Sequence, residues 1–154
     1  MIVNTRRFGE IEIDEKEVIT FKGPILGFGY FQKYVFIQSE DSQLPFEFLQ
    51  SVEDQNLTFI VTDPFVFVNE YEFHLDSHWM DALEVVDEKD VQVLVIVTAR
   101  SASDITCNLR APIVLNRAKS FAAQIVLEHG SYTTKHSLFG GKEGEDSNVD
   151  LVQE

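Results

Sequence analysis

Apolar and polar residues alternate over short stretches of this chain, which is the pattern of half-buried β-strands. Near the N-terminus, Ile11 and Ile13 can face inward while Glu10 and Glu12 face water. Continuous apolar runs of strand length follow, and Val91–Thr98 is the clearest of them. The same reasoning predicts further strands at 18–21, 34–37, 58–62, 65–68, 71–73, 113–115 and 122–127.

Two stretches have helical features. Between Asp76 and Leu83, Asp76 or Ser77 can cap a helix, and apolar residues at i, i+3 or i+4 spacing from Leu83 share one face. Pro45 suits the first position of a helical turn within 44–52. Many short strands with little helix predict a mostly β chain, a small single-domain β-barrel-like fold with one or two short helices, although a sandwich has a similar pattern.

The chain length of 154 residues fits one domain. The strand pattern extends over residues 1–138, which we take as the folded β domain. Residues 139–154 contain two adjacent glycines, five acidic residues and few large apolar groups, so we expect a disordered acidic tail.

Two short segments hold large apolar side chains whose placement the pattern leaves open, and in the second, 44–51, not all of them can face one core. One is rich in glycine and predicts a turn, in which core packing of Leu26 and Phe28 is favoured over an exposed contact. In the other, 44–51, Phe46 or Phe48 could lie near the surface as an aromatic anchor. Burial of both is equally compatible with this pattern, because a turn can direct two faces inward.

Acidic residues are unevenly distributed along the chain, whose formal net charge is −14. Residues 1–90 hold 19 acidic and 6 basic residues, whereas 91–139 hold 2 acidic and 5 basic residues. Direct nucleic-acid binding is therefore not expected, because Lys and Arg contacts to phosphate dominate that affinity. A basic protein partner fits this charge, and so does a surface whose acidity only maintains solubility.

The acidic run within 81–90 is the most concentrated charge, with Lys89 as its only compensating base. It is either a solvated helix end and loop or a docking face for a basic partner. Its members are Asp81, Glu84, Asp87, Glu88 and Asp90.

No residue pattern indicates catalysis or a cofactor. His74 and His78 are four residues apart, but the glutamate of a zinc-protease motif is missing and no third ligand lies near. Cys107 has no nucleophile signature around it and is expected to be a packed, inert thiol. One cysteine, no signal-peptide pattern and no apolar run of membrane-spanning length favour a cytoplasmic protein that binds neither metal nor membrane.

The most informative segment is Thr106–Asn116, with the sequence TCNLRAPIVLN. Pro112 cannot donate a ladder hydrogen bond, and asparagine at both 108 and 116 tolerates turn geometry, so polar turn residues surround a short buried strand. Such a segment contributes shape rather than reactive groups, which points to a recognition protein.

This segment is similar to the signature of the flagellar assembly factor family, FliW. Further segments that match the family follow in the same order over roughly residues 1–138, and Cys107 is one departure, where a small residue such as Ala is expected. The matching segments are Thr5–Ile11, Phe21–Phe28, Pro45–Ser51, Asp63-Pro64 with Tyr71, and Gln124–Leu127.

The resemblance implies a non-enzymatic regulator that binds flagellin and the carbon storage regulator, a small dimeric RNA-binding repressor of flagellin translation. Flagellin would hold the protein until export frees it to bind the repressor, which is a partner switch. The open alternative is a β-barrel that binds or hydrolyses a small molecule. We expect partner contacts from the acidic run and from two motif segments, namely Glu84, Asp87, Glu88, Asp90, Phe46, Phe48, Gln50 and Asn108.

Overall fold

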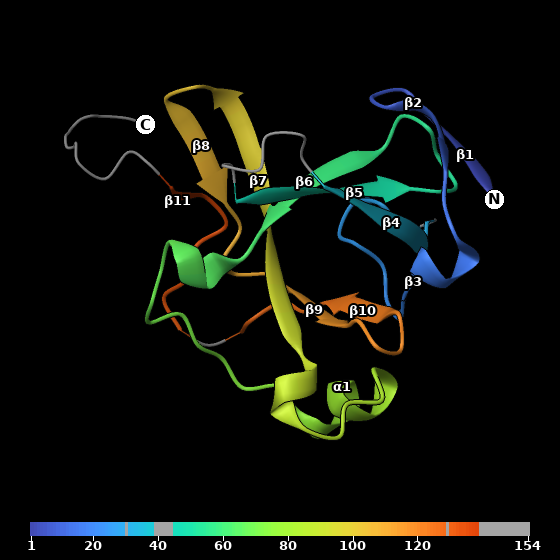
Figure 1. The fold of residues 1–154 in the computed structure, drawn as a ribbon. Helices are drawn as coiled ribbons and strands as arrows, with labels where there is room; N and C mark the ends of the chain where they lie inside the picture. Colours follow the sequence, from blue (N-terminus) through green and yellow to red (C-terminus); the bar gives the residue numbers. More distant parts are fainter. Residues whose placement is uncertain (30, 39–44, 129, 139–154) are drawn as a thin grey trace.

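A sheet that closes on itself forms the body of the molecule (Figure 1). The computed structural model describes residues 1–29, 31–38, 45–128 and 130–138. All neighbouring pairs in the ring are antiparallel except β3 and β10, which are parallel. The ring runs from β7 (Gln92–Ser101) through β6 (Thr58–Thr62), β5 (Phe46–Ser51), β4 (Lys33–Gln38), β3 (Ile19–Phe21), β10 (Phe121–Gln124) and β9 (Ile113–Asn116) back to β7.

Shorter elements decorate this barrel. A separate hairpin is formed by β1 (Ile2–Thr5) and β2 (Gly9–Glu12), while β8 (Asp104–Cys107) and β11 (His136–Ser137) extend the sheet outward from β7. The helical elements are α1 (Ser77–Ala82) and the 3-10 helices η1 (Glu15–Glu17), η2 (Pro64–Val66) and η3 (Glu88–Asp90). Among the described residues, no helix has the length and apolar character needed to span a membrane. The predicted mostly β, barrel-like, single-domain fold is confirmed.

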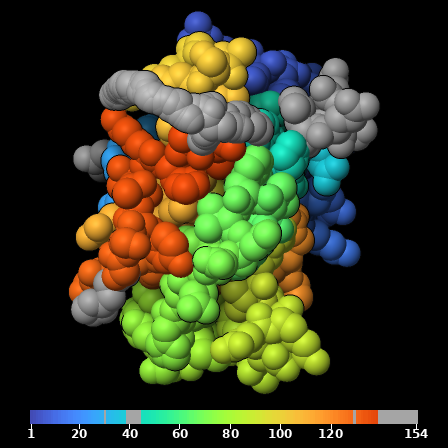
Figure 2. All heavy atoms as spheres, turned by 90° about the vertical axis from the view of Figure 1, so that its left-hand side faces the viewer, coloured from blue at the N-terminus to red at the C-terminus, as the bar shows by residue number. Residues whose placement is uncertain are grey.

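Buried apolar side chains of the described residues form four clusters, and the two largest contain Tyr34 and Tyr71. Phe21, Tyr34, Leu49 and Ile113 belong to one cluster and are at most 1% exposed, as the period of two residues along a strand requires. A second cluster lies around Tyr71, whose hydroxyl donates to the Leu109 carbonyl over 2.6 Å. Figure 2 shows the chain around Tyr71 (green) side by side with the C-terminal segment (red), so irregular chain covers this face.

Several predicted elements are confirmed. Strand β6 has the predicted bounds, and Val91–Thr98 falls almost wholly within β7. Asp76 is the N-cap of α1, because its Oδ1 accepts from the Trp79 backbone N–H over 3.1 Å. Leu83 is fully buried at the end of this helix.

The predicted helical turn within 44–52 is wrong, because this segment forms strand β5 from Phe46; Leu44 lies outside the described residues. The strand explains its dense apolar content. Leu49 packs in the first core, whereas Phe46 packs against the second cluster. Successive strand side chains point to opposite faces, and here both faces are covered.

The strands predicted at 65–68 and 71–73 are also wrong. Asp63 caps the 3-10 helix η2, its carboxylate accepting from the Phe65 N–H over 2.8 Å, and no strand forms between η2 and α1. The strand predicted at 122–127 ends at Gln124, although backbone N–H groups beyond it still donate to carbonyls of residues 110 and 112. The predicted tail, 139–154, lies outside the described residues.

Candidate functional site

The predicted contact residues fall in two regions of the molecule. Four of them belong to the segment 84–90, which we call the acidic loop and which joins α1 to β7. The others lie on or beside strands β5 and β8. Each region has its own supporting contacts and its own chemistry.

Buried residues hold the backbone of the acidic loop against the barrel. Leu83 and Val85 are 0% and 8% exposed, and Glu84 between them has a φ of 56°, which turns the chain outward. The Asn116 side-chain amide donates to the carbonyls of Leu83 (2.9 Å) and Glu84 (3.2 Å). Asn116 is only 2% exposed and its Oδ1 has no partner among the described residues, so its contribution is these two donated bonds.

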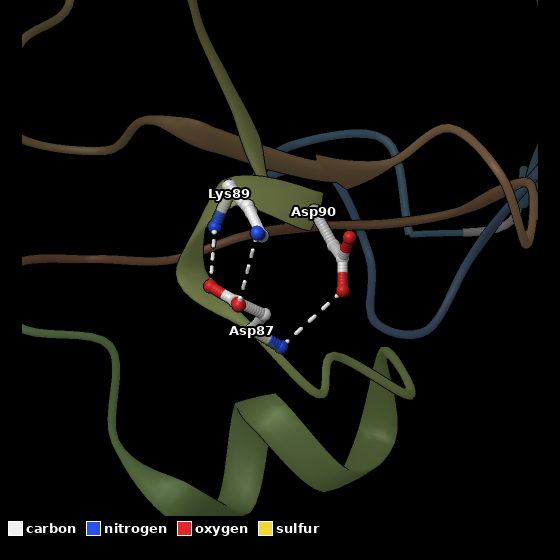
Figure 3. A network of polar contacts seen from close by, with 3 residues as sticks. All are labelled: Asp87, Lys89 and Asp90. Carbon is white, nitrogen blue, oxygen red and sulfur yellow. Dashed lines mark hydrogen bonds and ion pairs between the residues drawn. The ribbon is translucent and has the colours of Figure 1, made fainter.

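Local hydrogen bonds then shape the second half of the loop (Figure 3). Asp87 accepts from the Lys89 backbone N–H over 3.2 Å, while the Asp87 N–H donates to the Asp90 carboxylate over 3.2 Å. The two carboxylates thus form a capping box around η3. The Lys89 ammonium lies 3.7 Å from Asp87, but both side chains are largely exposed, so this pair adds little to stability.

The outer surface of the loop combines negative charge with an apolar tip. Val86 is 89% exposed, and the Glu88 carboxylate makes no ion pair with the described residues. Glu84 pairs with Lys119 at 3.7 Å across an exposed surface. A cavity of about 180 Å³ beside the loop includes Glu88 and Met80 in its lining. The loop therefore fits a basic protein surface that also offers apolar contacts.

The second region surrounds an open groove of about 470 Å³, lined in part by β6, β7 and the turn at 25–28; we call it the barrel groove. The expected core packing of Leu26 and Phe28 is wrong, because they are 58% and 37% exposed at this groove. Gly27 between them has a φ of 86°, and the Phe28 N–H donates to the Ile25 carbonyl over 2.8 Å. This tight turn buries Ile25 and leaves its two neighbours on the surface.

Of the four contact residues predicted outside the acidic loop, two adjoin the barrel groove. Asn108 lines it, and its side-chain oxygen accepts from the backbone N–H groups of residues 110 and 111. Phe48 is half-buried, and the guanidinium of Arg7, which also lines the groove, lies 4.5 Å from the Phe48 ring centroid. Phe46 is half-buried in the second core.

Gln50 must be removed from the expected contact surface, because its side chain is 0% exposed. Its amide instead donates to the Ser51 carbonyl at the end of β5 over 3.1 Å and to the carbonyls of residues 54 and 55 in the following turn, while its side-chain oxygen accepts from the Thr58 hydroxyl. A fully buried and hydrogen-bonded glutamine stabilises the fold rather than meeting a partner.

The candidate reactive residues do not form an active site among the described residues. Cys107 is 1% exposed, which confirms it as a packed thiol, and burial raises its pKa to about 11. His136 lies opposite Cys107 in the β8–β11 pairing, but burial lowers the pKa of His136, so both groups are neutral near pH 7. His74 and His78 are exposed, and no group of three metal-ligating side chains occurs in the described part of the chain.

These features define a small closed-barrel protein with an acidic loop and a separate groove beside which Leu26 and Phe28 are exposed. The family model described as FliW protein matches residues 2–138. Flagellar assembly factor FliW of Alkaliphilus metalliredigens is 40% identical over 139 residues, covering 90% of this chain and 86% of that protein. The protein of the same name from Bacillus subtilis is 43% identical over 142 residues, covering 91% and 98%.

A solved structure agrees with these relatives. The crystal structure of the flagellar assembly factor FliW superposes with a TM-score of 0.83 at 38% identity, covering 90% of this chain and 97% of that one. The chain belongs to the FliW family of flagellar assembly factors.

Sequence pattern alone did not identify Asn116 or Arg7 as site residues. Asn116 reaches the acidic loop from 33 and 32 positions further along the chain, and nothing local to it indicates that contact. Arg7 lies in the turn of the first hairpin, close to Phe48 only because of the fold. One feature of the sequence could have predicted that Leu26 and Phe28 are exposed, namely the glycine that lies between these two large apolar residues.

Proposed function

We propose that this flagellar assembly factor binds flagellin and the carbon storage regulator, and that exchange between these partners relieves repression of flagellin translation. It would act in the cytoplasm without catalysing a reaction or contacting RNA directly. Membership of the flagellar assembly factor family supports the biological setting. We choose the acidic loop as the contact surface for the repressor because its outer surface combines negative charge with an apolar tip.

An RNA-binding repressor is expected to be basic, because lysine and arginine neutralise phosphate. The acidic loop has four carboxylates and one ammonium, and it is held in place by Asn116. Complementary charge accelerates encounter with such a partner, by about 10–10³ at low salt. Once the complex has formed, the same carboxylates would repel RNA phosphates near the repressor.

A switch between partners requires that flagellin and the repressor disfavour one another's binding. Either overlapping surfaces or negative coupling between separate surfaces meets this requirement. In the second case the coupling must be reciprocal, and a typical coupling of about 1–3 kcal/mol changes affinity by roughly 5-fold to 150-fold. This range suffices when partner concentrations lie near the dissociation constants.

The alternative, a barrel that binds or hydrolyses a small molecule, receives less support. His74 lines the cavity beside the acidic loop, but His78 and Cys107 do not join it there. Burial raises the pKa of Cys107 well above neutrality, which disfavours a nucleophilic thiolate. Open surfaces of opposite chemistry fit protein recognition better.

The test is the association rate with purified carbon storage regulator, measured at several salt concentrations. The variant combines Glu84→Gln, Asp87→Asn, Glu88→Gln and Asp90→Asn, and the asparagine introduced at position 87 is still a good capping residue. We expect association about 10-fold slower at low salt and a shallower salt dependence than in the unmodified protein.

A matched control places the same change of charge elsewhere. It combines glutamine substitutions of four exposed glutamates near the N-terminus, Glu10, Glu12, Glu15 and Glu17. The proposal expects a smaller effect from this control. Equal slowing in both variants would mean that only net charge matters, and slowing in the control alone would place the docking face near the N-terminus.

A further inference from the structure

The barrel groove differs in charge from the rest of this acidic protein. Among the described residues that line it there is no aspartate or glutamate, and Arg7 is its only charged side chain. The chain as a whole has 26 acidic and 12 basic residues. A surface free of carboxylates in such a protein is therefore suited to a ligand that the acidic loop would repel.

Exposed apolar side chains at the groove can bind apolar groups of a ligand. Leu26 and Phe28 are among the exposed large apolar residues of the described chain. The Phe28 ring packs edge-on against Phe59 with ring centroids 5.1 Å apart, and the Leu26 N–H donates to the Gln124 side chain over 2.8 Å. The turn is thus held in a defined conformation, so its apolar side chains are available without a large ordering cost.

Strand edges border the same groove. Strand β6 pairs with β7 only from Ile60 to Thr62, whereas Thr58 and Phe59 pair only with β5. Beyond Val97, the described pairings of β7 are all with β8. The two strands therefore diverge where they line the groove, and each leaves an edge that an extended backbone can approach.

Arg7 supplies a fixed positive charge at the groove. Its guanidinium stacks on Phe48, and it forms no ion pair with a carboxylate of the described residues. Stacking on an aromatic face leaves the edge of a guanidinium free to bind a carboxylate through two hydrogen bonds. An incoming acidic side chain would satisfy this group.

We propose that the barrel groove binds an extended peptide segment of a partner protein, with alternating aliphatic side chains and one aspartate or glutamate. The aliphatic side chains contact Leu26 and Phe28, the backbone runs along the diverging edges of β6 and β7, and the carboxylate pairs with Arg7. This inference goes beyond the proposed function, because it assigns a second surface and does not depend on the acidic loop.

The experiment selects peptides from a library of displayed random heptapeptides on the purified full chain. Each peptide is fused at its C-terminus, so any carboxylate must come from aspartate or glutamate. We expect the selected sequences to alternate aliphatic residues and to contain one acidic residue. Failure to enrich any sequence, or enrichment of basic sequences, would overturn the proposal.

The best selected peptide is then synthesised with blocked ends and titrated by fluorescence anisotropy. Arg7→Gln should weaken binding by about 5-fold to 10-fold through loss of a charge-assisted pair, and Leu26→Ser by about 10-fold through loss of apolar burial. Arg6→Gln and Val66→Ser serve as controls, because both residues are exposed and neither lines the groove.

Two further measurements show whether weaker peptide binding comes from loss of groove contacts or from an effect elsewhere in the protein. The unfolding midpoints of the two groove variants should stay close to that of the unmodified protein, since both residues are exposed and an exposed cation–π contact such as that of Arg7 contributes little to stability. The fourfold acidic-loop variant should bind the peptide as well as the unmodified protein does, whatever its behaviour toward the repressor. Equal loss of binding in the controls, or loss only in the acidic-loop variant, would place the peptide elsewhere and overturn the proposal.

Discussion

The acidic loop and the barrel groove offer opposite chemistry on one small barrel. The loop is a charged surface held from beneath by buried Leu83, Val85 and Asn116. The groove has a mixed polar and apolar lining with exposed Leu26 and Phe28, and Arg7 is the only charged side chain among the described residues that line it. Strand β7 begins at Gln92, soon after the loop, and reaches the groove at Ile96, roughly 13 Å further along an extended strand. The two regions are therefore separate surfaces that one strand connects.

Because of this difference, the two regions should affect different steps of partner binding. Exposed charges act before contact, so changes in the loop should alter mainly the association rate and its salt dependence. Apolar contacts act only after docking, so changes in the groove should alter mainly the dissociation rate. The proposed exchange of partners would gain from having these two properties on separate surfaces.

The largest expected effect comes from removing the support of the acidic loop. Asn116→Ala deletes two hydrogen bonds to backbone carbonyls and leaves the buried Leu83 carbonyl without its partner. We expect a loss of about 1–3 kcal/mol in the free energy of unfolding, measured with denaturant. Association with the repressor should slow while the groove peptide binds normally. Asn69→Ala, at an exposed position, is the control, and equal stability of both variants would contradict this role for Asn116.

A smaller effect is expected from the turn at the groove. The Cβ added by Gly27→Ala has no atom within 4 Å, so the variant is destabilised only by the positive φ of 86°. We expect the free energy of unfolding to fall by about 1–2 kcal/mol. Because Leu26 and Phe28 flank this residue, peptide binding should weaken while repressor association is unchanged. Gly29→Ala is the matched control, since its added Cβ makes only an ordinary contact at 3.5 Å. Peptide affinity unaffected by Gly27→Ala would show that the turn conformation is irrelevant.

The smallest effect on function is expected at Cys107. Cys107→Ala removes a buried sulfur and should lower the free energy of unfolding by about 1 kcal/mol. Binding of both the repressor and the peptide should persist, because the thiol lies in a core and has a raised pKa. Loss of either activity in a folded variant would revive a reactive role for this residue.

The local sequence pattern predicts a secondary-structure element correctly in two situations. One is a strand whose alternate side chains face a single core, and the other is a helix whose capping residue bonds a backbone group only a few residues away. Strand β6 and the N-cap Asp76 are of this kind. It failed at 65–73, where apolar residues resemble strands but the chain forms a 3-10 turn and Tyr71 anchors to the Leu109 carbonyl. The competing partner lies 38 residues away, so no local property of the segment reveals it.

The acidic loop could be predicted from the sequence and the barrel groove could not, because only the groove depends on contacts between distant parts of the chain. The acidic loop is contiguous in sequence, so its charge is visible without a structure. The barrel groove joins the first hairpin, the turn at 25–28 and strands β6 and β7, and depends on ring closure through the parallel pairing of β3 and β10. Gln50 illustrates the limit of the motif argument, because a residue in a matching segment can serve the fold alone.

The separation of the two surfaces is tested most directly by titrating the repressor calorimetrically into three proteins. These are the unmodified chain, the fourfold acidic-loop variant and the Arg7→Gln/Leu26→Ser double variant. We predict weaker repressor binding for the acidic-loop variant and unchanged binding for the groove variant. Equal weakening in both, or weakening in the groove variant alone, would contradict two distinct surfaces with opposite chemistry.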